Sequence, residues 1–269
     1  MIFLVNGSSH VWLPFYIFNA HEYRSPVLVV LIVLEFVVSL FCVLITIKLC
    51  IYIWKIRVFH INMSVLAIAY LTQYLECFVA KWLITLHQIG FFPISGVPPE
   101  KKFSNWWTDD VDSIAPIRSV SSALPLFVGG FLLWHYLYSM ILFTFSLCVE
   151  RTLATVLSGN YERHSRVYIS ILVLTTSHFL TLTISYQTFS NRVDFVKTVI
   201  GCIVCVAMSC VIFVVILFMN QKIDKVQSST RSHHFYTLAF RFQVKENIKA
   251  LKVSALRCAC LLARARIQI

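Results

Sequence analysis

The chain has 269 residues, of which 58% are hydrophobic and only 13% are charged. A soluble domain carries roughly 45–50% apolar residues, so this composition, with a mean hydropathy of +0.78, excludes a soluble globular protein. The formal net charge of +11 does not indicate a nucleic-acid partner, because the basic residues are spread through short connectors and one tail.

Residues 1–26 are predicted to form an extracellular segment ahead of the first membrane span. Met1–Val5 is too short for the apolar region of a signal peptide, and Glu22 and Arg24 follow without a clear cleavage site. Asn6 opens the tripeptide Asn-Gly-Ser, an acceptor pattern for N-glycosylation, which is used only on the outer or lumenal side. The sequence therefore predicts an outer amino terminus with a glycan at Asn6.

Five apolar segments follow, and each is long enough to cross about 30 Å of hydrocarbon, which takes about 20 helical residues. Because lipid offers no hydrogen bonds to the backbone, these segments must be helices. The predicted spans are residues 27–47, 61–80, 123–149, 167–185 and 199–219. We expect an all-α integral membrane bundle over residues 27–219, embedded in the lipid bilayer, and a basic tail over residues 220–269.

The basic residues indicate the orientation of the bundle. The links after the first and third spans, together with the tail, hold sixteen of the 23 Lys and Arg residues, and the opposite side holds seven. Short loops rich in Lys and Arg stay in the cytoplasm. The amino terminus is therefore expected outside the cell and the tail inside, which leaves residues 81–122 as a long outer loop.

No constellation of residues predicts catalysis or a metal site. The outer loop contains Trp106 and Trp107, a pair suited to the membrane interface. Its aspartates, Asp109, Asp110 and Asp112, lack the spacing of an EF-hand calcium loop. The nine cysteines fall in apolar runs or in the tail, without partners at zinc-site spacing. We expect no catalytic residue, no metal and no cofactor.

Four ionisable side chains lie deep inside the predicted spans: Glu35, Glu76, His135 and His178. An unpaired charge at the middle of a membrane costs about 2.5–3.5 kcal/mol on insertion scales. Glu35 is therefore expected to be protonated or hydrogen-bonded toward the bundle interior. For all four, two interpretations stay open: an interhelical hydrogen bond and a contact with a ligand.

The inner end of the third span carries Glu150 and Arg151, and Arg163 and Arg166 follow in the next loop. An arginine at this boundary can pair with a neighbouring carboxylate while a helix bundle is closed, and can reach a partner protein when the bundle opens. Such a pair would act as an ionic latch. The alternative is a charged pair that only marks the membrane interface.

The segment ERTLATVLSGNYERHSR at Glu150–Arg166 resembles the second intracellular loop of the nematode serpentine receptor class epsilon (Sre) chemoreceptors. Three further segments are similar to that family, in the same order along the chain: Ser8–Asn19, Lys55–Leu66 and Arg241–Leu251. The resemblance implies a seven-helix protein of the G-protein-coupled-receptor type in the plasma membrane of sensory neurons. Such a protein detects small chemicals and signals through a heterotrimeric G protein.

Two features depart from the family pattern. Arg241–Leu251 looks like the family's lead-in to the sixth helix, yet the residues after it are too few and too basic to span a membrane. We therefore expect a GPCR-like bundle with five of the family's seven helices, as in a truncated sequence. The stretch Tyr186–Thr198 also contains no cysteine, so it lacks the partner for a rhodopsin-type disulfide to the third helix.

The leading prediction is a chemosensory receptor in which an unknown small molecule binds among the outer halves of the third to fifth spans. The residues expected to line that pocket are Phe127, Phe131, Trp134, Thr181, Thr183 and Cys202. The residues expected to couple to the G protein are Glu150, Arg151, Arg163 and Arg166. Two alternatives stay open: a receptor fragment that does not signal, and a small-solute transporter, which the lack of an inverted repeat disfavours.

Overall fold

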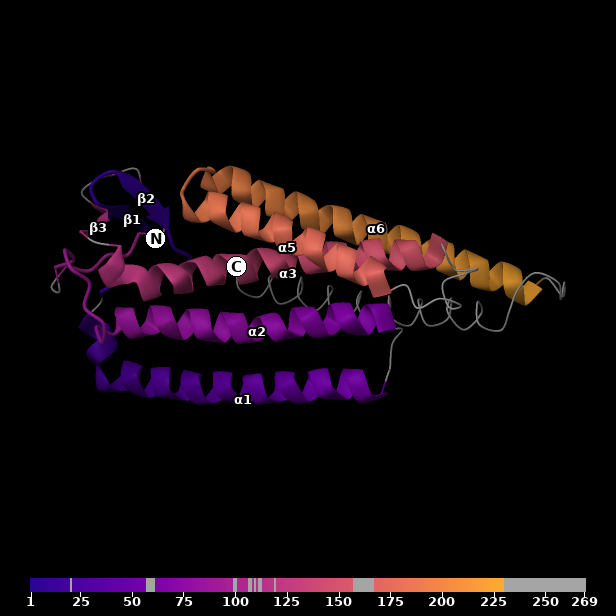
Figure 1. The fold of residues 1–269 in the computed structure, drawn as a ribbon, viewed down its shortest axis with the longest axis horizontal. Helices are drawn as coiled ribbons and strands as arrows, with labels where there is room; N and C mark the ends of the chain where they lie inside the picture. The colour runs from indigo at the N-terminus through magenta and orange to yellow at the C-terminus, as the bar shows by residue number, and fades with distance from the viewer. Residues whose placement is uncertain are drawn as a thin grey trace.

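The computed structural model describes residues 1–19, 21–56, 61–98, 101–105, 108, 110, 113–118, 120–156 and 167–229. Within these ranges, five long helices lie side by side as a bundle (Figure 1), and each is long and apolar enough to cross a membrane. They are α1 Pro26–Ile56, α2 Ile61–Gln88, α3 Leu124–Val156, α5 Val167–Phe189 and α6 Phe195–Ser229. The expected helical membrane bundle is therefore confirmed.

All five helices extend beyond the predicted apolar spans. α1 ends at Ile56 rather than near residue 47, and α2 ends at Gln88 rather than near residue 80. Hydropathy detects only the part of a helix that lies in hydrocarbon, whereas the backbone hydrogen bonds continue into the headgroup region. The 31 residues of α1 rise about 46 Å, comparable with a whole bilayer of about 40–45 Å. The outer loop is shorter than expected, because Lys81–Gln88 belongs to α2.

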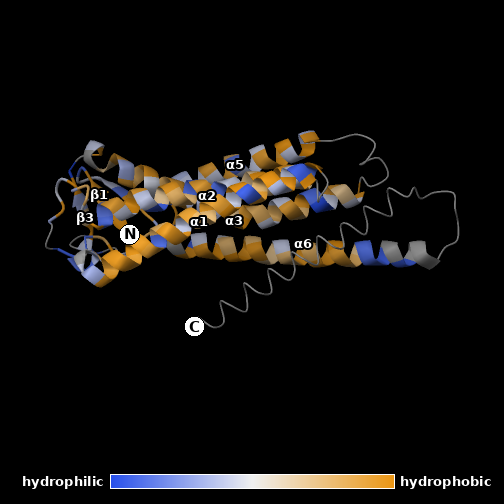
Figure 2. Ribbon diagram, turned by 90° about the horizontal axis from the view of Figure 1, so that it is seen from below, coloured by the Kyte–Doolittle hydropathy of each residue, from blue (hydrophilic) through white to orange (hydrophobic). Residues whose placement is uncertain are grey.

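Helices α2, α3 and α5 form the centre of the bundle. α1 packs on α2 and α6 packs on α3, so these two helices lie at opposite sides of the centre (Figure 1). Among the described side chains of α1, Ile53 alone is buried. Hydrophobic residues cover α1 and most of α6, and the hydrophilic part of α6 is its carboxyl end (Figure 2). A helix that is apolar on all sides suits contact with lipid.

A small sheet that the sequence analysis did not predict covers one end of the bundle. β1 Ile2–Val5 pairs antiparallel with β2 Ser9–Trp12 and parallel with β3 Ala115–Ile117. Asn6 and Gly7 connect the first two strands with positive φ angles of 50° and 71°, and Asn-Gly is the residue pair that hairpin turns of this handedness prefer. We call these three strands the outer cap, because the orientation predicted from the basic residues would place this end outside the cell.

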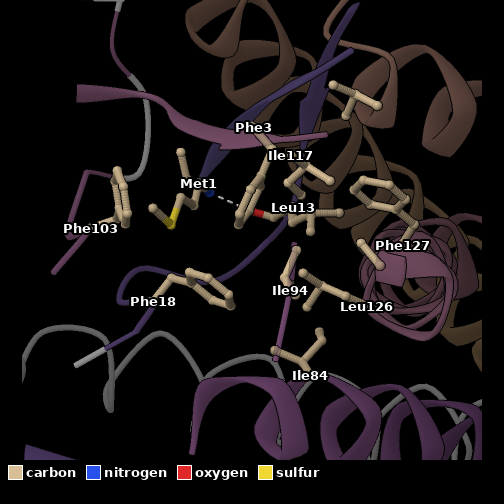
Figure 3. Packing of buried hydrophobic residues seen from close by; sticks show 13 residues of the cluster. Met1, Phe3, Leu13, Phe18, Ile84, Ile94, Phe103, Ile117, Leu126 and Phe127 are labelled. Carbon is tan, nitrogen blue, oxygen red and sulfur yellow. Dashed lines mark hydrogen bonds between the residues drawn. The ribbon is translucent and has the colours of Figure 1, made fainter. Parts of the chain in front are cut away.

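An apolar core fixes the outer cap to the helices. Phe3 and Leu13 are fully buried, and they lie against Ile84 of α2 and against Leu126 and Phe127 of α3 (Figure 3). The amino-terminal segment therefore packs into the end of the bundle rather than extending away from it.

Polar backbone contacts complete this packing. The Met1 amino group donates hydrogen bonds to the carbonyl oxygens of Leu13 and Phe15. Burial lowers the pKa of this amino group to about 4, so at neutral pH it is held there without charge. Phe18 and Phe103 exchange two backbone hydrogen bonds of 2.7 and 3.1 Å. The latter pair ties the amino-terminal segment to the loop after α2.

Helices α2 and α3 approach each other closely at Gly129. A Cβ atom at this position would lie 2.9 Å from the carbonyl oxygen of Ala80 and 3.1 Å from the Cβ of Leu83. Small residues allow such approach of helix backbones inside membranes. The contact sets the separation of the two helices that carry Glu76 and His135.

Candidate functional site

Polar side chains gather between α2, α3 and α5, near the midpoints of the three helices. We call them the interior polar cluster, and its members are Tyr70, Gln73, Glu76, His135, Ser139, Ser146, Ser177 and His178. Spacings of three and four residues within α2 and α3 place the side chains of each helix on one face. The helical periodicity of these segments therefore directs the polar groups toward a common region.

Glu76 and His135 form the centre of the interior polar cluster. The two carboxylate oxygens of Glu76 lie 2.7 and 3.0 Å from Nδ1 of His135. The His178 ring stacks on the His135 ring, with centroids 5.5 Å apart and planes 18° apart. The amide nitrogen of Gln73 lies 3.5 Å from Nε2 of His178. Three helices are thus joined through one carboxylate, two imidazoles and one amide.

A chain of hydroxyl groups extends the cluster away from the outer cap, toward the opposite end of the bundle. The Tyr70 hydroxyl lies 3.1 Å from Oγ of Ser146, and Oγ of Ser146 lies 2.7 Å from Oγ of Ser177. The Tyr70 ring also stacks against His178, with centroids 6.2 Å apart. Hydrogen bonds between helices are a main source of cohesion inside a membrane, so this chain holds α2, α3 and α5 together.

The cluster retains hydrogen-bonding capacity that the protein does not use. Among the described residues, Oε1 of Gln73 and Oγ of Ser139 are buried and have no hydrogen-bond partner, and the same is true of Oγ of Ser185 on α5. A buried polar group without a partner costs about 1–3 kcal/mol. Polar residues kept inside a membrane in spite of such costs mark functional sites. The interior polar cluster is therefore the candidate binding site.

Glu35 lies elsewhere: it is hydrogen-bonded to the neighbouring helix, as one of the two expected alternatives has it, but its side chain does not lie in the bundle interior. Its side chain is 49% exposed and forms an ion pair with Lys81 of α2. Hydropathy alone predicts that Lys81 lies in the outer loop. Because α2 continues to Gln88, Lys81 stays beside α1 and supplies the countercharge that Glu35 needs.

A second set of residues fills the space between the outer cap and the helices. The indole nitrogen of Trp134 donates a 2.8 Å hydrogen bond to the carbonyl oxygen of Trp12, and the two rings lie 4.9 Å apart. Trp134 stacks on Tyr138, whose hydroxyl lies 2.9 Å from Oγ1 of Thr188. Cys202 packs against the same group. The outer end of α3 is therefore occupied by the chain's own amino-terminal segment.

The six residues predicted to line the pocket fall into two groups. Phe127 and Phe131 both pack edge-on against Phe189 of α5, so they lie near the outer end of the bundle, as Trp134 and Cys202 do. Thr181 is buried, and its hydroxyl bonds to a carbonyl of its own helix. Thr183 is exposed and does the same. The structure thus brings four of the six together and leaves Thr183 outside the bundle.

The predicted latch residues lie buried near the carboxyl end of α3. Glu150 and Arg151 are only 0% and 3% exposed, and Nε and Nη2 of Arg151 donate to the two carboxylate oxygens of Glu150 at 2.5 and 2.9 Å. Such two-pronged pairs are stronger than single hydrogen bonds. Nearby, Asn220 of α6 donates a 3.2 Å hydrogen bond to Oγ1 of Thr155. The pair is therefore enclosed by α3 and its neighbours.

Several predicted residues lie outside the part of the chain that the structure describes: Trp106, Trp107, Asp109, Asp112, Arg163 and Arg166. The tail beyond residue 229 does too. In the described part, no group of three or more His, Cys, Asp and Glu side chains is arranged to hold a metal ion, and the cysteines there are free thiols.

Sequence reasoning missed Trp12 and Phe189, which pack against most of the predicted pocket residues. For Trp12 a local signal exists, because an Asn-Gly pair between two apolar stretches favours a hairpin that carries this residue. For Phe189 no such signal exists. Its contacts with Phe127 and Phe131 depend on how α5 is rotated against α3.

Comparisons with known proteins agree with this architecture. The family model described as Sre G protein-coupled chemoreceptor matches residues 1–262. Serpentine receptor class epsilon-38 of Caenorhabditis elegans is 33% identical over 244 residues, which cover 90% of this chain and 66% of the relative. Serpentine receptor class epsilon-37 of the same organism is 28% identical over 253 residues, with coverages of 93% and 70%. The chain thus spans about two thirds of the length of these relatives. No solved structure matches the chain.

Proposed function

Because the chain belongs to the Sre family of G protein-coupled chemoreceptors, we propose that it acts as a chemosensory receptor in the plasma membrane of sensory neurons. It binds a small molecule from outside the cell and signals to a heterotrimeric G protein inside. The observation that carries the proposal is the match of the family model to residues 1–262, nearly the whole chain.

The distribution of polar groups along the bundle supports this function. The outer cap closes one end, the interior polar cluster lies near mid-depth, and Glu150 and Arg151 lie near the opposite end. A receptor needs a ligand-binding region and a coupling region in one continuous helical body. Helix α3 contacts the outer cap through Trp134 and carries His135 of the interior polar cluster and Arg151 of the coupling region. It can therefore transmit a movement from one region to the next.

The proposed mechanism is a shift between two arrangements of the bundle. A ligand favours whichever arrangement it binds more tightly, and it can shift the equilibrium only by that difference in affinity. In the arrangement described here Arg151 is buried and paired with Glu150. We infer that the active arrangement exposes Arg151 on the cytoplasmic side, where it meets the G protein together with Arg163 and Arg166.

The orientation that this function requires has the outer cap outside the cell. Asn6 supports it, because this glycosylation acceptor lies in an exposed turn. The excess of basic residues at the other side of the spans supports it as well.

The proposal is tested by expressing the chain with a promiscuous G protein in cultured cells and recording calcium during exposure to a panel of small odorants. At least one compound is expected to evoke a response, and Arg151→Ala is expected to abolish it when the response is normalised to the amount of protein at the cell surface. Absence of any response from surface-expressed protein, under conditions in which one of the serpentine receptor relatives responds, would contradict signalling. Solute flux into liposomes carrying the chain would favour a transporter instead.

A further inference from the structure

We propose that the interior polar cluster binds a small organic amine in its protonated form, with Glu76 as the countercharge. This inference rests on the proposed receptor function, and it names the chemical class of the ligand. Three observations on the cluster carry it: the charge balance of the membrane-spanning carboxylates, the hydrogen-bonding capacity left around Glu76, and the exposure of its side chain.

The charge balance singles out Glu76. Three carboxylates lie within the apolar spans of the described helices, the last of which ends at Lys222. Two of them face residues that are always cationic: Glu35 pairs with Lys81 and Glu150 pairs with Arg151. Glu76 faces His135, and a histidine carries a positive charge only when it is protonated. With a neutral imidazole, the ionised carboxylate is left without a balancing charge, which is costly inside a membrane. A bound cation removes that cost.

The unused hydrogen-bonding groups match an ammonium ion. An ionised carboxylate accepts at about four lone-pair sites, and the partner of Glu76 in the cluster is His135 Nδ1. One turn away on the same face of α2, Oε1 of Gln73 is a buried acceptor without a partner among the described residues, and so is the hydroxyl of Ser139 on α3. A primary ammonium group offers three donors and no acceptor. It complements these groups, whereas a carboxylate ligand would be repelled by Glu76.

The surroundings favour an amine with an aromatic body. Tyr70 packs against Phe143 with ring centroids 4.5 Å apart and against the His178 ring. Glu76 also keeps 20% of its side chain exposed, unlike the fully enclosed Glu150. The Glu76 side chain is therefore partly accessible. The Tyr70 and Phe143 rings belong to the group that contacts His178, which stacks on His135, and they can contact the apolar part of a ligand.

The test measures binding to the full chain in lipid nanodiscs with three probes of similar shape: phenethylamine, phenethyl alcohol and phenylpropionate. Binding is read by saturation-transfer NMR and by the change in tryptophan fluorescence. The wild-type chain is expected to bind the amine at least about tenfold more tightly than the alcohol, because a buried, hydrogen-bonded charge pair is worth more than about 1.4 kcal/mol. It is expected not to bind the anion.

Three variants separate the role of Glu76 from a general loss of structure. Glu76→Gln is expected to reduce the preference for amine over alcohol to about onefold while alcohol binding persists. Glu76→Asp keeps the charge and should keep the preference. Glu22→Gln is the matched control, because Glu22 lies in the exposed outer segment and pairs with Lys102, and its preference should equal that of the wild type. If Glu76→Gln does not fold, the wild-type ratio and Glu76→Asp decide the matter.

Equal binding of amine and alcohol by the wild type overturns the inference, and so does a preference that survives in Glu76→Gln. In the first case the cluster is an internal hydrogen-bond network and not an amine site. The outcome is independent of signalling. Amine binding without any cellular response contradicts the receptor function alone, whereas responses to neutral odorants without amine binding contradict this inference alone.

Discussion

The indole N–H of Trp134, on the third long helix of the bundle, donates a 2.8 Å hydrogen bond to the backbone carbonyl of Trp12, in the second strand of the outer cap. These residues are 122 positions apart in the chain. Trp134 also stacks on Tyr138 and is followed directly by His135, the partner of Glu76. The amino-terminal segment is thus attached to the same turn of α3 that contributes to the candidate binding site.

Replacing Trp134 with Phe is expected to loosen the outer cap. The substitution keeps an aromatic ring beside Trp12 but removes a buried hydrogen bond, worth about 1 kcal/mol net, so amide hydrogen exchange in residues 1–12 should rise about fivefold. Trp82→Phe is the matched control, because the indole nitrogen of Trp82 has no hydrogen-bond partner in the described part of the chain. Equal exchange rates in the two variants would mean that this hydrogen bond does not hold the cap.

Replacing Gly129 with Ala is expected to destabilise the bundle by about 1–3 kcal/mol, the usual cost of overpacking. The new methyl group would lie 2.9 Å from the backbone oxygen of Ala80, and a backbone atom cannot move aside as a side chain can. Gly201→Ala gives the opposite expectation. Nothing lies within 4 Å of a Cβ at that position, so a gain of up to about 1 kcal/mol in helix propensity should appear. Thermal unfolding in nanodiscs measures both, and a lower melting temperature for Gly129→Ala alone is the expected result.

Replacing Glu150 with Gln is expected to raise ligand-independent G-protein activation at least about fivefold, which is the lower end of ordinary allosteric coupling. The neutral amide cannot balance the Arg151 charge, so the enclosed arrangement loses the ion pair that favours it. Basal nucleotide exchange on a purified G protein gives the readout. Glu22→Gln serves as the control, since that carboxylate lies in the exposed outer segment. An unchanged basal rate in Glu150→Gln would indicate that the pair only marks the membrane interface.

Replacing Asn6 with Gln is expected to increase the electrophoretic mobility of the chain made in cultured cells, because the proposed orientation exposes Asn6 to the glycosylation machinery. Treatment of the wild type with a glycosidase should give the same shift. Asn62 matches the same acceptor pattern, but it is fully buried at the start of α2. Asn62→Gln should therefore leave the mobility unchanged. If the Asn6→Gln variant keeps a glycan and the Asn62→Gln variant loses it, the chain has the opposite orientation in the membrane.

Features that depend on residues close together in the chain were predicted correctly, and contacts between residues far apart in the chain were missed. Hydropathy located the five spans, because burial in lipid depends on the composition of about 20 successive residues. It gave their ends poorly, since Lys81 terminates an apolar stretch without ending a helix. Because of that error, the ion pair between Lys81 and Glu35 was not predicted. Trp12 was missed for a related reason, because its strand is only four residues long.

Several features could be inferred from the order of amino acids before the fold was known: the membrane class, the number of described spans, the family, and the adjacency of Glu150 and Arg151. Each of these depends on residues that are close together in the chain or on a pattern that the chain carries along its length. Three relationships required the folded arrangement of the helices: Glu76 faces His135, His178 stacks beside them, and Trp12 packs against Trp134. Such contacts depend on the rotation and depth of whole helices relative to one another, which close packing sets and periodicity alone does not specify.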